Sequence, residues 1–239
     1  MKTDLGIDLI EGHTGAWDHC NNFRYHVWWH KALLHLDRGE LDVALGLYDA
    51  QIRAEKTDDY RDISNATSLL VRLELDGMDV GPRWAELAEI AETRTDDGCV
   101  VFADLHYMLA LTGANRPDAQ QRMKARFARD ATQTGEMEQR FATPGVAALS
   151  GLNAFAEGRY DAAFTDLAHA RPDMQTIGGS HAQRDVFERL TIDAGLRAGR
   201  YAQTEAILQD RMDRRAGQAD RFAVTRLQSI EDARRIPAQ

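Results

Sequence analysis

The chain has 239 residues, 44% of them apolar and 28% charged, which is enough to bury a substantial core and excludes a globally disordered protein. The net charge is −9, so we expect no nucleic-acid partner, because a phosphate backbone requires an excess of basic side chains. No apolar run is long enough to cross a bilayer, no signal-peptide pattern opens the chain, and Cys20 and Cys99 are too few for a disulfide framework. We therefore expect a cytoplasmic protein without a membrane partner.

A repeated unit organises the sequence. In each copy an apolar stretch ends at a glycine and is followed by an alanine-containing amphipathic stretch, as in LLHLDRGELDVALGLYDAQI around Gly39. Glycine ends a helix readily, because it adopts the left-handed backbone conformation without strain. After an N-terminal extension over residues 1–20, the pattern predicts five helical hairpins and a last helix near 219–235. The hairpins are 21–37 with 40–55, 60–76 with 80–95, 98–112 with 116–134, 144–157 with 159–170, and 181–198 with 200–216.

Helix-start signals agree with these bounds. Pro82, Pro117 and Pro144 stand where a first helical residue belongs, and Ser180 to Gln183 has the S-x-x-Q form of a capping box. No segment alternates apolar and polar residues as a strand does, so the fold class is all-α. The five turn glycines are 36 to 45 residues apart, which is looser than the period of about 34 residues in tetratricopeptide (TPR) repeats. They are Gly39, Gly77, Gly113, Gly158 and Gly199.

We therefore expect one domain over residues 1–239, a right-handed α-solenoid of about five TPR-like helical hairpins. The hairpins occupy 21–216 and a capping helix occupies 217–239. Such hairpins stack because each leaves one apolar face uncovered.

Two segments resemble the tetratricopeptide repeat protein 38 family. They are NNFRYHVWWH, at residues 21–30, with its continuation KALLHLDRGELDVALGLYDAQI, and IGGSHAQRDVF, at residues 177–187. Generic TPR repeats have neither the HxWWH start nor the GGSHAQRD cap. The resemblance covers residues 17–210 and corresponds to the C-terminal half to two-thirds of longer family members. It implies a helical-repeat fold and supplies no agreed activity or catalytic residues.

His26 and His30 are four residues apart, so on a helix they share one face and could ligate one metal ion. No glutamate follows His26, so the general base of a metalloprotease is absent. The structural alternative is that Trp28 and Trp29 bury this helix while the imidazoles form hydrogen bonds. The sequence leaves open whether the histidines hold a metal.

His106 is a bulky, half-polar residue where this repeat class usually has a small one. Either it forms a buried hydrogen bond, to Asp104, Tyr107 or a neighbouring helix, or it joins His26, His30 and His181 in one site. The second hypothesis rests on the expectation that the first helices of the hairpins line a common concave surface.

Two further segments have a functional and a structural interpretation. Gly178 to His181, with Arg184, could bind an anion at a helix N-terminus or could simply cap that helix. The aromatic residues between Trp17 and Trp29 could seal the first hairpin or form a ligand cage. Exposed, this cluster would favour a homo-oligomer.

The first helices together predict a concave lining that is apolar and sparsely charged. This favours a TPR-like binding or scaffold protein with a groove for a peptide or small molecule, without a cofactor or catalytic residue. The alternative is an enzyme, or a metal- or small-molecule-binding protein, with a histidine-lined pocket. The expected lining is His26, Trp29, Leu33, Ser64, Thr67, Val71, Ala103, Tyr107, Ala148, Leu152, Phe155, Val186, Arg189 and Asp193. The candidate ligand-binding residues are His26, Trp29, His30, His106, Tyr107, His181, Arg184 and Arg189.

Overall fold

The computed structural model describes residues 2–235, and the described residues form helices and turns without any β-strand. The predicted all-α fold class is confirmed. Residues 236–239 of the predicted capping region lie outside the described residues. None of the described helices has the length and apolar character needed to span a bilayer.

Five helix pairs follow one another in the predicted order, each joined by a short turn. The pairs are α3 (Asn21–Arg38) with α4 (Leu41–Leu47), α5 (Tyr60–Leu75) with α6 (Arg83–Thr93), α7 (Val101–Gly113) with α8 (Pro117–Asp130), α10 (Val146–Ala156) with α11 (Tyr160–Ala170), and α12 (His181–Arg197) with α13 (Tyr201–Asp213). A π-helical turn, η1 (Tyr48–Ile52), extends α4, and α14 (Arg221–Arg235) ends the described chain.

Glycines end most of the leading helices as predicted. Gly39, Gly77, Gly158 and Gly199 all have φ between 71° and 88°. The prediction for Gly113 is wrong, because Gly113 is the last residue of α7 and Asn115 takes the left-handed position, with a φ of 52°. Gly113 instead lets α6 approach α7: a Cβ there would lie 2.4 Å from Cδ2 of Trp84.

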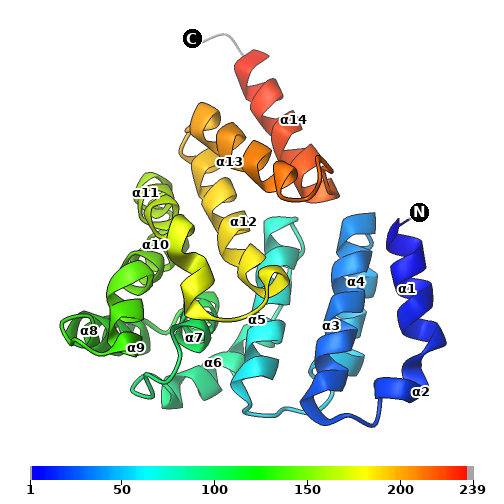
Figure 1. The fold of residues 1–239 in the computed structure, drawn as a ribbon, viewed down its shortest axis with the longest axis horizontal. Helices are drawn as coiled ribbons and strands as arrows, with labels where there is room; N and C mark the ends of the chain where they lie inside the picture. Colours follow the sequence, from blue (N-terminus) through cyan, green and yellow to red (C-terminus); the bar gives the residue numbers. More distant parts are fainter. Residues whose placement is uncertain (1, 236–239) are drawn as a thin grey trace.

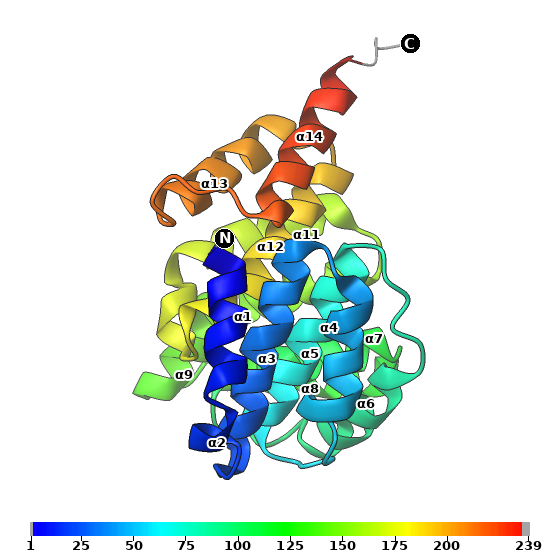
Figure 2. The same cartoon turned by 90° about the vertical axis from the view of Figure 1, so that its right-hand side faces the viewer.

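The sequence pattern missed several short elements. The predicted extension over residues 1–20 contains α1 (Lys2–Gly12) and α2 (Thr14–Trp17), and α1 packs along α3 (Figure 2). Between α8 and α10 lie α9 (Glu136–Arg140) and η2 (Phe141–Gly145), and η3 (Arg171–Ile177), a 3-10 helix, precedes α12.

The N-terminal aromatic residues divide between the core and the surface. Trp17 meets Trp28 edge to face, with 5.1 Å between ring centroids, and Trp29 is wholly buried. Phe23 is 56% exposed. The cluster therefore seals the first hairpin in large part, and the homo-oligomer expected through it stays a prediction.

The leading helices pack side by side and then close on themselves. α3 contacts α5, α5 contacts α7, and α7 contacts α10, while α12 returns to α5, which lies between α12 and α3 in Figure 1. A direct link joins the ends of this circuit, because Nη2 of Arg72 on α5 donates to the carbonyl of Ala182 on α12 at 2.7 Å.

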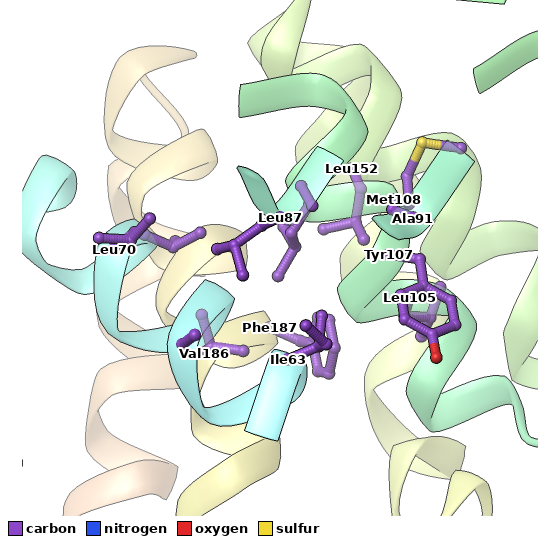
Figure 3. Packing of buried hydrophobic residues seen from close by; sticks show 14 of the residues in the cluster. Ile63, Leu70, Leu87, Ala91, Leu105, Tyr107, Met108, Leu152, Val186 and Phe187 are labelled. Carbon is purple, nitrogen blue, oxygen red and sulfur yellow. The ribbon is translucent and has the colours of Figure 1, made fainter. Parts of the chain in front are cut away.

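This closure fills the centre of the molecule with apolar side chains. Figure 3 shows Ile63 of α5, Leu152 of α10, and Val186 and Phe187 of α12 converging in one core. Val186 is wholly buried, as is Ile63. Burial of apolar surface such as this is the dominant favourable contribution to folding.

The predicted concave lining does not form an open groove in the part of the chain that the structure describes. Its members are mostly buried, because α12 packs against α5 where the hollow was expected. His26, Leu33 and Phe155 are half-buried. The buried members are Trp29, Ser64, Thr67, Val71, Ala103, Tyr107, Ala148, Leu152, Val186, Arg189 and Asp193.

The C-terminal helices are held by a small core and by ion pairs. Phe222 and Ile230 of α14 pack with Leu208 of α13. Nη1 of Arg226 donates to Asp76 at 2.7 Å, and its Nη2 donates to the carbonyl of Leu75 at 2.6 Å. These contacts attach α14 to the end of α5.

Candidate functional site

A polar cavity of about 240 Å³ lies between α3 and α12 and is called here the α3–α12 cavity. It is lined by His30, Leu33, Leu34, Leu36, Asp37, Arg72, His181, Ala182, Asp185, Arg189 and Arg215. Helical spacing explains most of the set: on α12, His181, Asp185 and Arg189 recur every four positions, which places them on one face, and Ala182 adjoins them. His30 and Asp37 are seven positions apart on α3 and likewise share a face.

The N-terminus of α12 is fixed by the predicted capping box. Oγ of Ser180 accepts from the backbone N–H of Gln183 at 3.3 Å, and Oε1 of Gln183 accepts from the backbone N–H of Ser180 at 2.9 Å. The box sets where the helix begins and therefore which face carries His181, Asp185 and Arg189 toward the cavity.

Arg72 is the most buried charge in the lining. Its Nη1 donates to the carbonyl of Ser68 at 2.9 Å, whereas the nearest carboxylate oxygen, on Asp185, is 3.7 Å from its Nη2. Its Nε is buried without a hydrogen-bond partner. Burial lowers the pKa of Arg72 to about 9, which reflects a positive charge that its surroundings compensate incompletely.

The carboxylate of Asp185 accepts hydrogen bonds from two other arginines. Its Oδ2 accepts from Nε of Arg189 at 2.6 Å, and its Oδ1 accepts from Nε of Arg211 at 3.0 Å. Burial opposes its charge, but the attraction of Arg189, Arg211 and Arg72 holds the pKa of Asp185 well below its usual range. Asp185 is therefore ionised and shared among these cations.

Two other arginines face the cavity. Nε of Arg189 is paired with Asp185 at 2.6 Å, and its Nη2 makes only a long contact, as Arg215 does. Nη2 of Arg189 and Nη2 of Arg215 each lie 3.5 Å from Oδ2 of Asp220. That carboxylate is bound more closely by Arg211, at 2.7 Å. Arg215 has 35% of its side chain exposed and no shorter ion pair, so its guanidinium is available at the cavity edge.

Asp37 is the opposing acid in the lining. The described residues contain no hydrogen bond or ion pair to its carboxylate, and burial, followed by repulsion from Asp220, raises the pKa of Asp37. Asp37 therefore neutralises the arginines less than a paired carboxylate would.

His26 and His30 form a hydrogen-bonded chain. Their Nε2 atoms are 3.1 Å apart, and Nδ1 of His26 lies 3.3 Å from Oδ1 of Asn65, which also accepts from Nε2 of Gln183 at 3.2 Å. Because that oxygen accepts, His26 donates from Nδ1, and His30 donates its Nε2–H to Nε2 of His26. Nδ1 of His30 then carries a lone pair.

Burial, with a smaller contribution from His26 and Arg72, lowers the pKa of His30 to about 4. The ring is therefore neutral at pH 7. It can accept a hydrogen bond but adds no charge to the cavity.

The predicted histidine cluster is assembled only in part. His30 and His181 line the same cavity, and His26 reaches it through His30. His106 is wholly buried between Phe102 and Phe187, with ring centroids at 4.4 and 5.0 Å, so it contributes no group to the cavity. Within residues 2–235 no group of histidine, cysteine and acidic side chains is placed to hold a metal ion.

The remaining predicted residues lie elsewhere. Trp29 is buried and donates Nε1–H to Oγ of Ser68 at 3.1 Å, so it supports the site without lining it. Tyr107 lines a separate cavity beside α7. Arg184 donates to the carbonyls of Gly178 and Gly179 and lines a third cavity on the other side of α12. Of the predicted arginines, the α3–α12 cavity therefore has only Arg189.

No family model matches this chain, and no solved structure matches it. The relation to the tetratricopeptide repeat protein 38 family stays a prediction from the two quoted segments.

Sequence reasoning missed four charged residues of the cavity, which are Asp37, Arg72, Asp185 and Arg215. Arg72 stands in an apolar run, SLLVRLEL, where a charge is a signal of a buried ionic contact. Asp37 and Arg215 carry no such signal, because Asp37 lies at the end of a helix and Arg215 lies within a turn, where charged residues are common.

Proposed function

We propose that this protein is a non-catalytic binding protein whose ligand is a small organic oxyanion, a carboxylate or a phosphate ester, held in the α3–α12 cavity. The observation that supports it most is Arg72, a fully buried guanidinium whose nearest carboxylate is 3.7 Å away and already bound to two other arginines. An oxyanion supplies the missing negative charge.

The rest of the lining fits such a ligand. Guanidinium groups bind carboxylate and phosphate in a planar, two-point geometry, and Arg189 and Arg215 both line this cavity. Arg215 has only a long ion pair of 3.5 Å, and Nη2 of Arg189 lies 3.5 Å from Asp220, although Nε of Arg189 also pairs with Asp185 at 2.6 Å. Leu33, Leu34 and Leu36 offer apolar contact to a carbon skeleton. The volume of about 240 Å³ is below the range of about 300–1,000 Å³ typical of drug-sized ligands, so the occupant is small.

The repeat class belongs to the same proposal. Five helix pairs in series, with small residues Ala44 and Ala163 wholly buried on the second helices of the first and fourth pairs, support a TPR-like solenoid. In this proposal the solenoid has closed, so that the ligand enters a cavity instead of lying along a groove. A peptide ligand is disfavoured for the same reason.

Thermal unfolding with added succinate tests the proposal. Succinate should raise the unfolding temperature of the wild-type protein, because a ligand that binds only the folded state stabilises it by mass action. The neutral four-carbon analogue 1,4-butanediol should have no effect. Equal effects of the two compounds, or no effect of succinate at saturating concentration and low salt, would contradict the proposal.

A matched pair of variants locates the binding. Arg215→Gln removes a cavity cation that has only one long ion pair, and it should weaken succinate binding about ten-fold, the usual loss for a hydrogen bond to a charged group. Arg200→Gln is the control, because Arg200 has a similar side-chain exposure, 38% against 35%, and pairs with Asp161 outside the cavity. Asp37→Asn, which removes the opposing acid, should tighten binding.

Catalysis is the second candidate, because Asp37 and His30 line one cavity. Burial raises the pKa of Asp37 and lowers the pKa of His30 to about 4. Carboxyl and imidazole groups arranged in this way serve general acid–base chemistry. Incubation of the bound anion with the protein, followed by NMR, separates the two: an unchanged ligand supports the binding protein, and a new product favours the enzyme.

A further inference from the structure

A second cavity, of about 360 Å³, lies beside α7 and is called here the α7 cavity. It is built from three segments that meet there: the loop before α5, the loop between α6 and α7, and one face of α7. Its lining residues are Asp58, Asp59, Tyr60, Arg94, Asp97, Cys99, Val100, Ala103, Asp104 and Tyr107.

The charge of the lining is strongly acidic, with four aspartates against one arginine. Arg94 forms ion pairs with two of these aspartates, Asp58 at 2.7 Å and Asp97 at 3.3 Å. Asp59 pairs with Arg61 at 2.6 Å, outside the lining. The cations present are thus divided among more carboxylates than they can neutralise.

Asp104 is the carboxylate whose negative charge is least completely neutralised by nearby cations. Its Oδ1 lies 2.8 Å from Nη2 of Arg126, a guanidinium that is also shared with Asp130 at 3.3 Å. Its Oδ2 is buried without a hydrogen-bond partner. Burial raises the pKa of Asp104 to about 6, as expected for a carboxylate whose charge is incompletely compensated.

Tyr107 supplies an independent observation. The residue is only 4% exposed, and the described residues contain no hydrogen bond to its hydroxyl. The hydroxyl oxygen itself keeps accessible surface, so it can form a hydrogen bond with a ligand in the cavity. One helical turn separates it from Asp104, so both belong to the same face of α7. In Figure 3 the Tyr107 hydroxyl points away from the packed side chains of Met108 and Ala91.

We propose that the α7 cavity binds a small organic cation, a primary ammonium, with the Asp104 carboxylate and the Tyr107 hydroxyl as its acceptors. An ammonium carries three donors and fits two acceptors of different kinds. The lining also contains the aromatic rings of Tyr60 and Tyr107, a residue type that attracts cations. A metal ion fits less well, since the described residues place no suitable group of ligands around one.

Calorimetric titration of the 239-residue chain with 1,4-diaminobutane tests this site. The wild-type protein should bind the diamine saturably, and 1,4-butanediol should produce no binding heat. Tyr107→Phe should weaken binding about ten-fold, because it removes one hydrogen bond to a charged group and keeps the ring.

Tyr48→Phe is the matched control. Tyr48 is also buried, at 3% exposure, its hydroxyl also has no hydrogen bond in the described structure, and it lies outside the α7 cavity. The affinity of the Tyr48→Phe variant for the diamine should equal that of the wild type. The proposal is overturned if the diamine does not bind saturably, if Tyr107→Phe binds as tightly as the wild type, or if both variants lose affinity equally.

Discussion

The imidazole of His106 has no solvent contact and no charged partner. Its Nδ1 lies 2.7 Å from the carbonyl of Phe102 in its own helix, and its Nε2 is buried without a partner. Since a carbonyl only accepts, Nδ1 carries a proton. The ring is neutral at pH 7, because burial lowers the pKa of His106 to about 4. The expected hydrogen bond to Asp104, Tyr107 or a neighbouring helix is replaced by one within α7.

This burial makes the stability of the protein depend on pH. Burial lowers the pKa of His106 to about 4 from its ordinary 6.5, so above pH 6.5 the ring is neutral in both the folded and unfolded states. As the pH falls from 6.5 to 4, only the unfolded chain gains the proton, and the folded state loses about 2–3 kcal/mol relative to it. His106→Leu should remove this loss.

Urea unfolding of the wild type and of His106→Leu at pH 7 and pH 4.5 measures the effect. On going from pH 7 to pH 4.5, the free energy of unfolding of His106→Leu should fall less than that of the wild type. His13→Leu is the control, because His13 is exposed, and its pH dependence should follow the wild type. Parallel behaviour of all three proteins would contradict a neutral, buried His106.

Residue-level prediction from the sequence succeeded where the signal was local. The Ser180 capping box, the turn at Gly39 and the shared face of His26 and His30 all follow from spacing within one helix turn. The role of Arg72 could not be predicted, because its partner Ala182 is 110 residues away.

At the scale of the element, periodicity and turn residues predicted the five pairs and α14 within a few residues. The helices α2 and α9, of four and five residues, were missed because so short a helix carries too little amphipathic pattern to distinguish it from a loop. Helix α1 was missed although its 11 residues equal the length of α6. Gly113 was interpreted as a turn because the sequence cannot show that Trp84 packs over it.

Gly113→Ala should therefore destabilise the protein by about 1–3 kcal/mol, the usual cost of overpacking, since the added Cβ would meet the indole of Trp84 at 2.4 Å. Gly46→Ala, in α4, is the matched substitution, because no atom lies within 4 Å of the added Cβ. It should stabilise by about 0.5–1 kcal/mol, since alanine is the better helix former. Denaturant unfolding of both variants checks the opposite signs, and equal signs would refute the close approach of α6 to α7.

At the scale of the whole molecule, the fold is decided by the return of α12 to α5. The circuit α3, α5, α7, α10 is predictable, because neighbouring hairpins in a series pack on one another. The return of α12 to α5 is not predictable from the sequence. It depends on contacts between residues more than a hundred positions apart, such as Val186 and Phe187 against α5 (Figure 3). It converts the expected groove into a filled core.

The same closure explains where ligands could enter. With the central lining buried, the remaining spaces lie where helices meet at their edges, and the two proposed sites have an excess of charge of opposite sign. The α3–α12 cavity has three arginines against two aspartates, and the α7 cavity has four aspartates against one arginine. Opposite charges predict that the two sites select different ligands.

A crystal structure of the protein grown with succinate tests the central proposal most directly. We predict electron density for the dicarboxylate in the α3–α12 cavity, with one carboxylate within hydrogen-bond distance of the guanidinium groups of Arg189 and Arg215. Succinate density only at the surface, with the cavity free of it at a concentration that shifts the unfolding temperature, would contradict the proposal.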